Sequence, residues 1–179
     1  MCIPLVVTML FAAGTAIADP ALEARVAAKH KILVSDEWGG GHRMIFEFGG
    51  RRAWIVEPAR PAAGRPWVWT MQWMGAYLDR TGAPELVRQG FHHVHLEAFD
   101  TRANDEGLKA LAEFQGYLVR ELGFAPKTGL IGMSWGGFYS IRYANAFPEK
   151  VSRTTLTRRS STLMGSAGMR RRRRRLRRL

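Results

Sequence analysis

The sequence predicts an α/β domain whose sheet begins with antiparallel strands and continues with parallel ones, with helices on both faces. Two observations lead to this prediction. Apolar residues alternate on both sides of Gly49-Gly50, which is typical of a hairpin. From residue 91 onward, strand and helix patterns take turns, which favours a parallel sheet. The 179 residues have no internal repeat and suit a single domain.

The first elements come before and around the hairpin. Residues 19–31 have a helix-forming composition. Beyond them, Met44, Phe46 and Phe48 alternate before Gly49-Gly50, and Trp54 and Val56 continue after it. We therefore expect a helix that leads into two antiparallel strands.

The middle of the chain predicts strands separated by a short helix. The run RPWVWT (residues 65–70) is aromatic and β-branched and follows a loop rich in Pro and Gly, so it is expected to be a third strand. Residues 83–89 lie between two glycines and can form a short helix, and residues 91–97 form the next strand.

The longest helix is predicted to start at Asn104, whose side chain can cap it. Its apolar positions recur every three or four residues, and Gly123 follows as a stop signal. These positions are Leu108, Leu111, Phe114, Leu118 and Leu122. A short apolar strand over residues 128–133 and a helix over residues 136–147, ended by Pro148, complete the order.

The first 18 residues have the features of an export signal. An apolar run from Ile3 to Ala13 leads to Ala16-Ile17-Ala18, a small-x-small pattern that signal peptidase accepts. The run is too short to span a bilayer. We therefore expect cleavage after Ala18 and a secreted or periplasmic protein. A buried N-terminal segment is the alternative, since the n-region has no Lys or Arg. After cleavage at Ala18, the mature chain would lack the single cysteine, Cys2, and with it any disulfide.

The net charge of +12 is concentrated near the C-terminus. Eleven arginines lie from residue 152 onward with no acid among them, so residues 1–151 carry only +1, which is 12 less 11. The densest part is Arg170–Arg178. Such a segment binds nucleic acid or anionic surfaces whether or not it was selected to do so. A protein whose function is that binding is therefore the alternative to an enzyme, although no nucleic-acid-binding motif accompanies the segment.

The stretch Gly132-Met133-Ser134-Trp135-Gly136 matches G-x-S-x-G between a predicted strand and a predicted helix. A serine on so tight a turn is held in an unfavourable backbone conformation, and glycines two positions away avoid collisions. The turn lifts the Ser134 hydroxyl above the sheet. It also puts the backbone N–H of Trp135 at the start of a helix, where it can stabilise an oxyanion.

On this motif, residues 44–151 resemble the N-terminal half of an α/β-hydrolase of the secreted esterase or prolyl-oligopeptidase-like branch. The resemblance implies a partial α/β-hydrolase sandwich and a serine hydrolase for a small-molecule carboxylic ester or related acyl bond, with Ser134 as nucleophile. It also implies a second oxyanion donor in the loop after the third strand, the backbone N–H of Thr70 or Met71. The run GGGHR (residues 39–43) is superficially similar to a lipase oxyanion loop, but it precedes the hairpin and is expected to be a plain turn.

The catalytic partners of the serine are missing from the sequence. The family order is Ser, then Asp or Glu, then His, but only Glu149 and no histidine follow Ser134. The five histidines all come earlier: His30, His42, His92, His93 and His95. His93 and His95 share one face of a strand, yet no third ligand is in view, so packing is preferred to metal binding. We expect no metal and no cofactor.

These gaps suggest a domain organisation of three parts: a signal peptide (1–18), the N-terminal half of a hydrolase domain (19–151) and a basic, irregular segment (152–179). Read one frame over, residues 152–162 can encode a peptide similar to the sixth strand of the family with its Asp-Ala-Pro exit. A frameshift near Val151 is therefore the hypothesis for the missing half. We expect an inactive, aggregation-prone product in which the strand before Ser134 lies at an open sheet edge.

Overall fold

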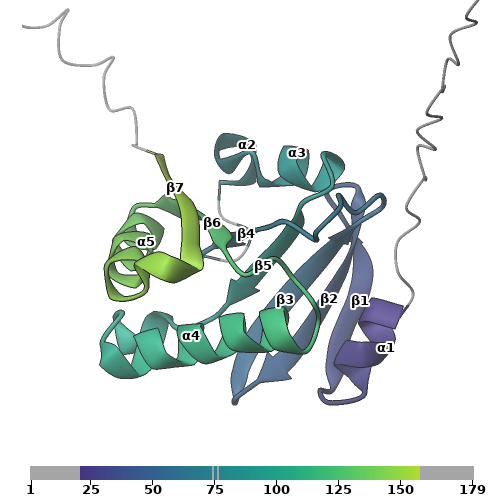
Figure 1. Ribbon diagram of the computed structural model, residues 1–179, viewed down its shortest axis with the longest axis horizontal. Coiled ribbons are helices and arrows are strands. Elements are labelled where there is room, and N and C mark those ends of the chain that lie inside the picture. The colour runs from purple at the N-terminus through teal and green to yellow at the C-terminus, as the bar shows by residue number, and fades with distance from the viewer. Residues whose placement is uncertain (1–20, 74, 76, 158–179) are drawn as a thin grey trace, which may run out of the picture.

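The computed structural model describes residues 21–157, apart from positions 74 and 76. Seven strands form one sheet in the order β1-β2-β3-β5-β4-β6-β7 (Figure 1). The strands are β1 (Ile32–Trp38), β2 (Gly41–Phe48), β3 (Arg51–Pro58), β4 (Trp67–Thr70), β5 (His92–Leu96), β6 (Thr128–Met133) and β7 (Val151–Thr157). The helices are α1 (Ala21–Ala27), α2 (Leu78–Thr81), α3 (Ala83–Arg88), α4 (Asp105–Arg120) and α5 (Trp135–Ala146), with short 3-10 turns at Phe99–Thr101 and Pro148–Lys150.

The sheet changes direction as predicted. Strands β1, β2, β3 and β5 pair antiparallel, whereas β5, β4, β6 and β7 pair parallel. Gly49 and Gly50 have φ of 57° and 73° in the turn between β2 and β3, the left-handed conformation that a two-residue hairpin loop requires. Met44 and Phe46 are buried against α1 and α4, while Trp54 and Val56 lie on the opposite face because they alternate with Ala53 and Ile55.

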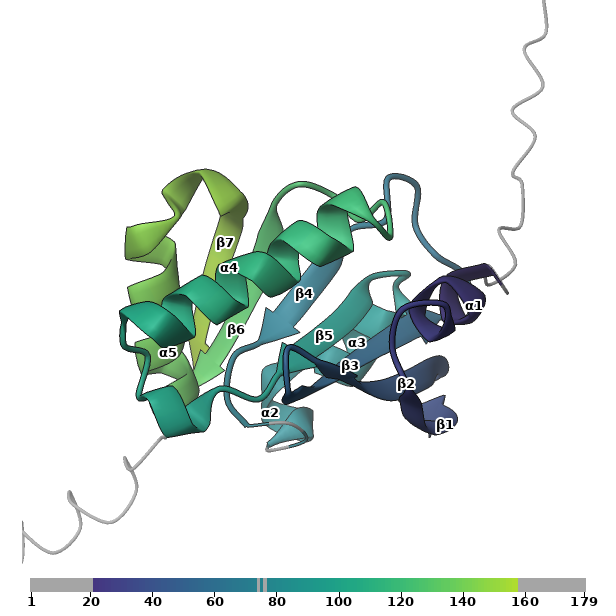
Figure 2. The ribbon, with the colours of Figure 1, turned by 90° about the horizontal axis from the view of Figure 1, so that it is seen from below.

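Helices cover both faces, but unequally. In Figure 2, α1, α4 and α5 lie in front of the sheet, and the main apolar cluster is on that side. A smaller cluster around Val68, Ala83 and Ile131 lies under α3 on the other side. Asn104 caps α4 as predicted, since its side chain accepts a hydrogen bond from Gly107 N at 2.8 Å, and all five predicted apolar positions of α4 and its exit are buried.

Two strands differ from the sequence-based expectation. β1 occupies residues 32–38, for which no element was predicted. β7 pairs parallel with β6 from Thr128↔Val151 to Met133↔Thr157. The expectation of an open edge at β6 is therefore wrong, and residues 151–157 are a strand, not an irregular segment. Val151 and the three threonines supply the β-branched side chains that favour a strand there.

The chain termini lie outside the described residues. The predicted export signal (1–18) and the arginine-rich segment at 170–178 both belong to them. Within the part that the structure describes, no helix is long and apolar enough to cross a membrane.

Candidate active site

Ser134 occupies a strained turn between β6 and α5. Its φ of 55° and ψ of −119° lie outside the regions that side chains other than glycine adopt freely, and the residue is exposed. Such strain persists only where the surroundings impose it, and it is common at functional sites. Ser134 therefore has the geometry predicted for a nucleophile presented above the carboxyl ends of parallel strands.

The glycines on either side are required by close contacts. A Cβ on Gly132 would meet Gly136 O and Ser140 Oγ, each at 2.6 Å. A Cβ on Gly136 would overlap Gln72 O, in the loop after β4. Side chains at these positions were expected to collide with the turn at Ser134. Instead, Gly132 faces the first turn of α5, and Gly136 faces a neighbouring loop.

The first turn of α5 leaves amide groups available beside the serine. Gly137 N and Phe138 N donate to Ser134 O at 3.0 and 3.2 Å. The N–H of Trp135 begins the helix and has no acceptor within it, as the first amides of any helix do not. The amide for which the sequence predicts a donor role therefore lies at the positive end of a helix.

The resemblance predicts a second donor in the loop after β4, at the N–H of Thr70 or Met71. Met71 N donates to Ile131 O at 3.3 Å, so this amide is already bonded to β6, which counts against Met71 as the oxyanion donor. The N–H of Thr70 points the other way, toward β5, because neighbouring amides alternate along a strand.

Gln72 is the residue that sequence reasoning missed. Its backbone atoms come closest to Gly136, with Gln72 N only 3.3 Å from a Cβ placed there. Its side chain is 3% exposed, and neither amide atom has a hydrogen-bond partner among the described residues. A buried, unpartnered side-chain amide in the loop that contacts Gly136 is a candidate hydrogen-bond donor to a bound oxygen.

Aromatic side chains surround the serine. An open pocket of about 480 Å³ is lined by Ser134, Trp135 and Phe138. The ring of Trp135 meets Phe99 edge-on at 5.5 Å, and Phe99 in turn contacts Trp73 at 4.8 Å. These residues follow β4, β5 and β6, so the carboxyl ends of three parallel strands meet at one apolar rim.

The histidines of β5 are buried away from this rim. His93 Nε2 lies 2.8 Å from Thr70 Oγ1, and His95 Nδ1 donates to Thr70 O at 2.7 Å. Burial lowers the pKa of His93 to about 3 and those of His92 and His95 to about 4, so all three are neutral at pH 7. His93 also stacks on Trp38 at 5.1 Å, which agrees with the predicted packing role.

Neither Glu149 nor His42 is placed to act as a base for Ser134. Glu149 is exposed in the turn that follows the C-terminal end of α5, whereas Ser134 precedes that helix. His42 lies in β2, in the antiparallel part of the sheet, whereas Ser134 follows β6. The Nε2 of His42 lies 2.8 Å from Ser35 Oγ and 3.6 Å from Glu23 Oε2. Both contacts involve the same ring nitrogen, so Glu23 does not orient His42 as a triad carboxylate would.

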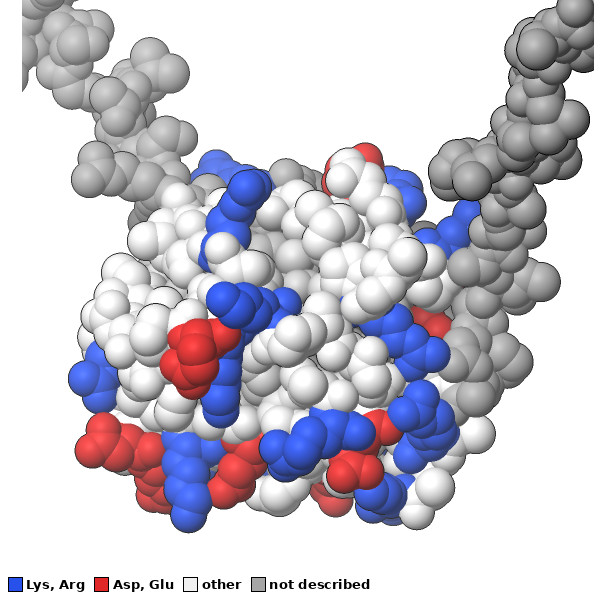
Figure 3. Space-filling model, in the orientation of Figure 1, with Lys and Arg blue, Asp and Glu red and all other residues white. Residues whose placement is uncertain are grey.

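Three further expectations concern the turn at residues 39–43, metal binding and nucleic-acid binding. Gly39 and Gly40 form the turn between β1 and β2, as predicted, with φ of 61° and 89°. Within the described ranges, no three His, Cys, Asp or Glu side chains come together as a metal site would need. The view in Figure 3 shows Lys and Arg interspersed with Asp and Glu, and this face has no continuous basic surface of the kind nucleic acid requires.

No protein-family model matches the chain, and no curated protein matches its sequence. Solved structures do match its fold. An S-formylglutathione hydrolase from Agrobacterium tumefaciens superposes with a TM-score of 0.55 at 15% identity, over 70% of this chain and 61% of that one. A cold-adapted esterase from an Arctic intertidal metagenomic library gives 0.50 at 17% identity, over 70% and 63%.

The chain spans less than two thirds of the length of either structure. In this chain the sheet turns from antiparallel to parallel, and the strained serine follows β6, one of its parallel strands. The chain has the fold of the α/β-hydrolase superfamily.

Proposed function

We propose that this domain is a serine hydrolase unit for a carboxylic ester or related acyl bond, with Ser134 as its nucleophile. The observation that carries the proposal is the exposed serine with φ of 55°, held where Gly136 is pressed against the backbone of Gln72. Such strain clusters at active sites, since a relaxed loop would connect β6 to α5 at lower cost.

The proposed reaction begins with attack of Ser134 Oγ on the acyl carbonyl. The carbonyl oxygen becomes an oxyanion. The backbone N–H of Trp135 and the side-chain amide of Gln72 donate hydrogen bonds to it. A base takes the proton of Ser134 during the attack and gives it to the leaving alcohol as the intermediate collapses. The product is an acyl-serine, which water then hydrolyses. The aromatic rim formed by Trp135 and Phe138 would contact the apolar part of the substrate.

We further propose that the 179-residue chain turns over its substrate negligibly. A neutral hydroxyl needs an imidazole to take its proton, and no histidine follows Ser134 in the sequence. The earlier histidines of β5 are bonded to Thr70 or buried. The frameshift hypothesis accounts for this deficiency and is tested by sequencing the gene through the codons for residues 145–179 and beyond. Secretion remains part of the proposal and is tested by N-terminal sequencing of exported protein.

Chemical rescue tests the role of Ser134. With p-nitrophenyl acetate alone, we expect the full chain and its Ser134→Ala variant to give the same slow hydrolysis. Added imidazole supplies the missing proton acceptor, so an acetyl group should then appear on Ser134 faster than on any other serine, as read by peptide mass spectrometry. Acetylation spread evenly over the serines would refute the nucleophile. A serine-dependent rate without imidazole would refute only the proposed inactivity.

A further inference from the structure

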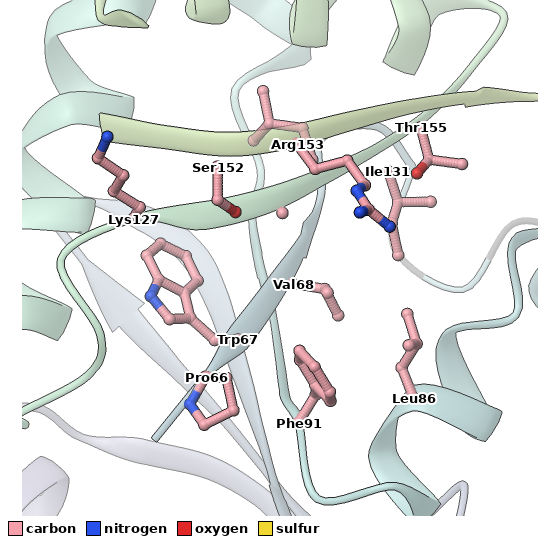
Figure 4. A pocket seen from close by; sticks show the side chains of 12 residues that line it. Pro66, Trp67, Val68, Leu86, Phe91, Lys127, Ile131, Ser152, Arg153 and Thr155 are labelled. Carbon is pink, nitrogen blue, oxygen red and sulfur yellow. The ribbon is translucent and has the colours of Figure 1, made fainter. Parts of the chain in front are cut away.

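A second pocket lies on the opposite face of the sheet from α4 and α5. It has a volume of about 430 Å³ and opens between α3 and β7 (Figure 4). Val68 and Ile131 form its floor, and both are almost fully buried in the smaller apolar cluster. Leu86 from α3 and Phe91, just before β5, form the wall facing β7.

The pocket exists because helices cover this face incompletely. Parallel strands are normally buried on both faces. Here α3 packs on β3, β4 and β5, whereas the principal helix contacts of β7 come from α5 on the other face. Gly129 widens the gap, because its position lacks a side chain between Val68 and β7.

The charged groups at the pocket are all cationic. Lys127 and Arg153 line it, and no Asp or Glu does. Neither cation forms an ion pair with any side chain that the structure describes. Figure 4 shows the Arg153 guanidinium extending over the pocket, whereas the Lys127 ammonium is directed away from its centre. Thr155 lies two positions beyond Arg153 in β7 and presents its hydroxyl on the same face.

We propose that this pocket binds a small amphiphilic anion, a carboxylate attached to an apolar chain. The carboxylate accepts hydrogen bonds from the Arg153 guanidinium and the Thr155 hydroxyl, and the chain lies on Val68, Ile131, Leu86 and Phe91. An apolar hollow with one guanidinium at its mouth suits both halves of such a molecule. Arg153 offers a charge-assisted hydrogen bond to an anion and none to a neutral lipid, and the apolar chain covers the hollow, which a small polar anion would not do. This site is independent of Ser134.

The test measures binding of octanoate to the full chain by titration calorimetry, with 1-octanol as the uncharged probe of the same chain length. We expect saturable binding of octanoate at one site. Arg153→Gln should weaken octanoate about tenfold, the effect of losing one charge-assisted hydrogen bond, and leave 1-octanol unchanged. Leu86→Gln should weaken both probes, because it removes apolar contact without touching the cation. Circular dichroism of each variant checks that it folds.

Arg52→Gln is the matched control. Arg52 is an exposed strand arginine in β3, and its loss changes the net charge by the same amount. Equal weakening by Arg52→Gln and Arg153→Gln would mean general attraction to a basic protein and would overturn the proposal. Binding of 1-octanol as tight as that of octanoate would also overturn it. Absence of octanoate binding would overturn it too. This includes the outcome in which no octanoate binds and size-exclusion chromatography shows a dimer that Leu86→Gln dissociates.

Discussion

At the scale of single residues, the site depends on which glycines are so close to other backbone atoms that a side chain would collide with them. Gly136 and Gly137 are adjacent in α5, yet their surroundings differ. A Cβ at Gly136 overlaps the carbonyl oxygen of Gln72, which is backbone and cannot turn aside. A Cβ at Gly137 would first meet Leu156 Cδ2 at 3.7 Å, an ordinary contact. The two positions therefore form a natural comparison.

We predict that Gly136→Ala destabilises the fold by about 1–3 kcal/mol, because the loop after β4 must move away from the turn. Gly137→Ala should be neutral or stabilising by up to about 1 kcal/mol, since alanine favours the helix. Urea unfolding followed by circular dichroism measures both. Equal effects of the two substitutions would show that Gln72 does not press on Gly136.

Sequence reasoning identified Ser134, Gly132, Gly136 and Trp135 because their spacing is a pattern that can be read. Gln72 could not be found in this way. A donor in a loop belongs to no spacing pattern, and its position depends on where β4 stops pairing with β6. That end point is set by the bond from Met71 N to Ile131 O, which is a tertiary feature.

At the scale of elements, the interior strands of the sheet were predictable and its two edge strands, β1 and β7, were not. The hairpin and α4 follow regular periods, which reflect burial against one core. β1 carries the polar run Ser35-Asp36-Glu37 at the sheet edge, where exposure removes the pattern. The β-branched residues of β7 are a signal that the arginines around them obscured.

The histidines of β5 make the stability of the fold depend on pH. Burial lowers their pKa to about 3 or 4, against 6.5 in an unfolded chain. Between these values the unfolded chain binds more protons than the folded one, so the free energy of unfolding falls as the pH drops below about 6.5.

We predict that His92→Gln flattens this dependence between pH 6 and pH 4.5. Each buried histidine contributes up to about 1.4 kcal/mol per pH unit, and the variant removes one of the three. Urea midpoints across this range give the slope. His42→Gln serves as the comparison, because His42 is only partly buried. A slope that His92→Gln leaves unchanged would mean that His92 is protonated in the folded protein.

At the scale of the whole molecule, apolar side chains gather on the surface near Ser134. Trp135, Phe138 and Ile141 on α5 are 41%, 44% and 47% exposed, and Leu156 at the end of β7 is 50% exposed. β7 is also the last strand of the described sheet. A patch of this kind beside a sheet edge favours self-association.

We predict that Ile141→Lys reduces aggregation of the full chain, as measured by light scattering during incubation at 37 °C. The added charge interrupts the apolar surface of α5 and repels a second copy. Asn145→Lys adds the same charge one helical turn further along, outside the apolar set, and should have a smaller effect. If both variants behave alike, net charge and not the apolar surface governs association.

The contact between Gly136 and Gln72 means that the turn at Ser134 is not encoded locally. Excised as a short peptide, the G-x-S-x-G stretch would relax, because the carbonyl that confines it belongs to a loop formed much earlier in the chain. The reactive geometry therefore appears only after β4 and β6 have become neighbours, so the conformation of one serine reports on assembly of the entire sheet.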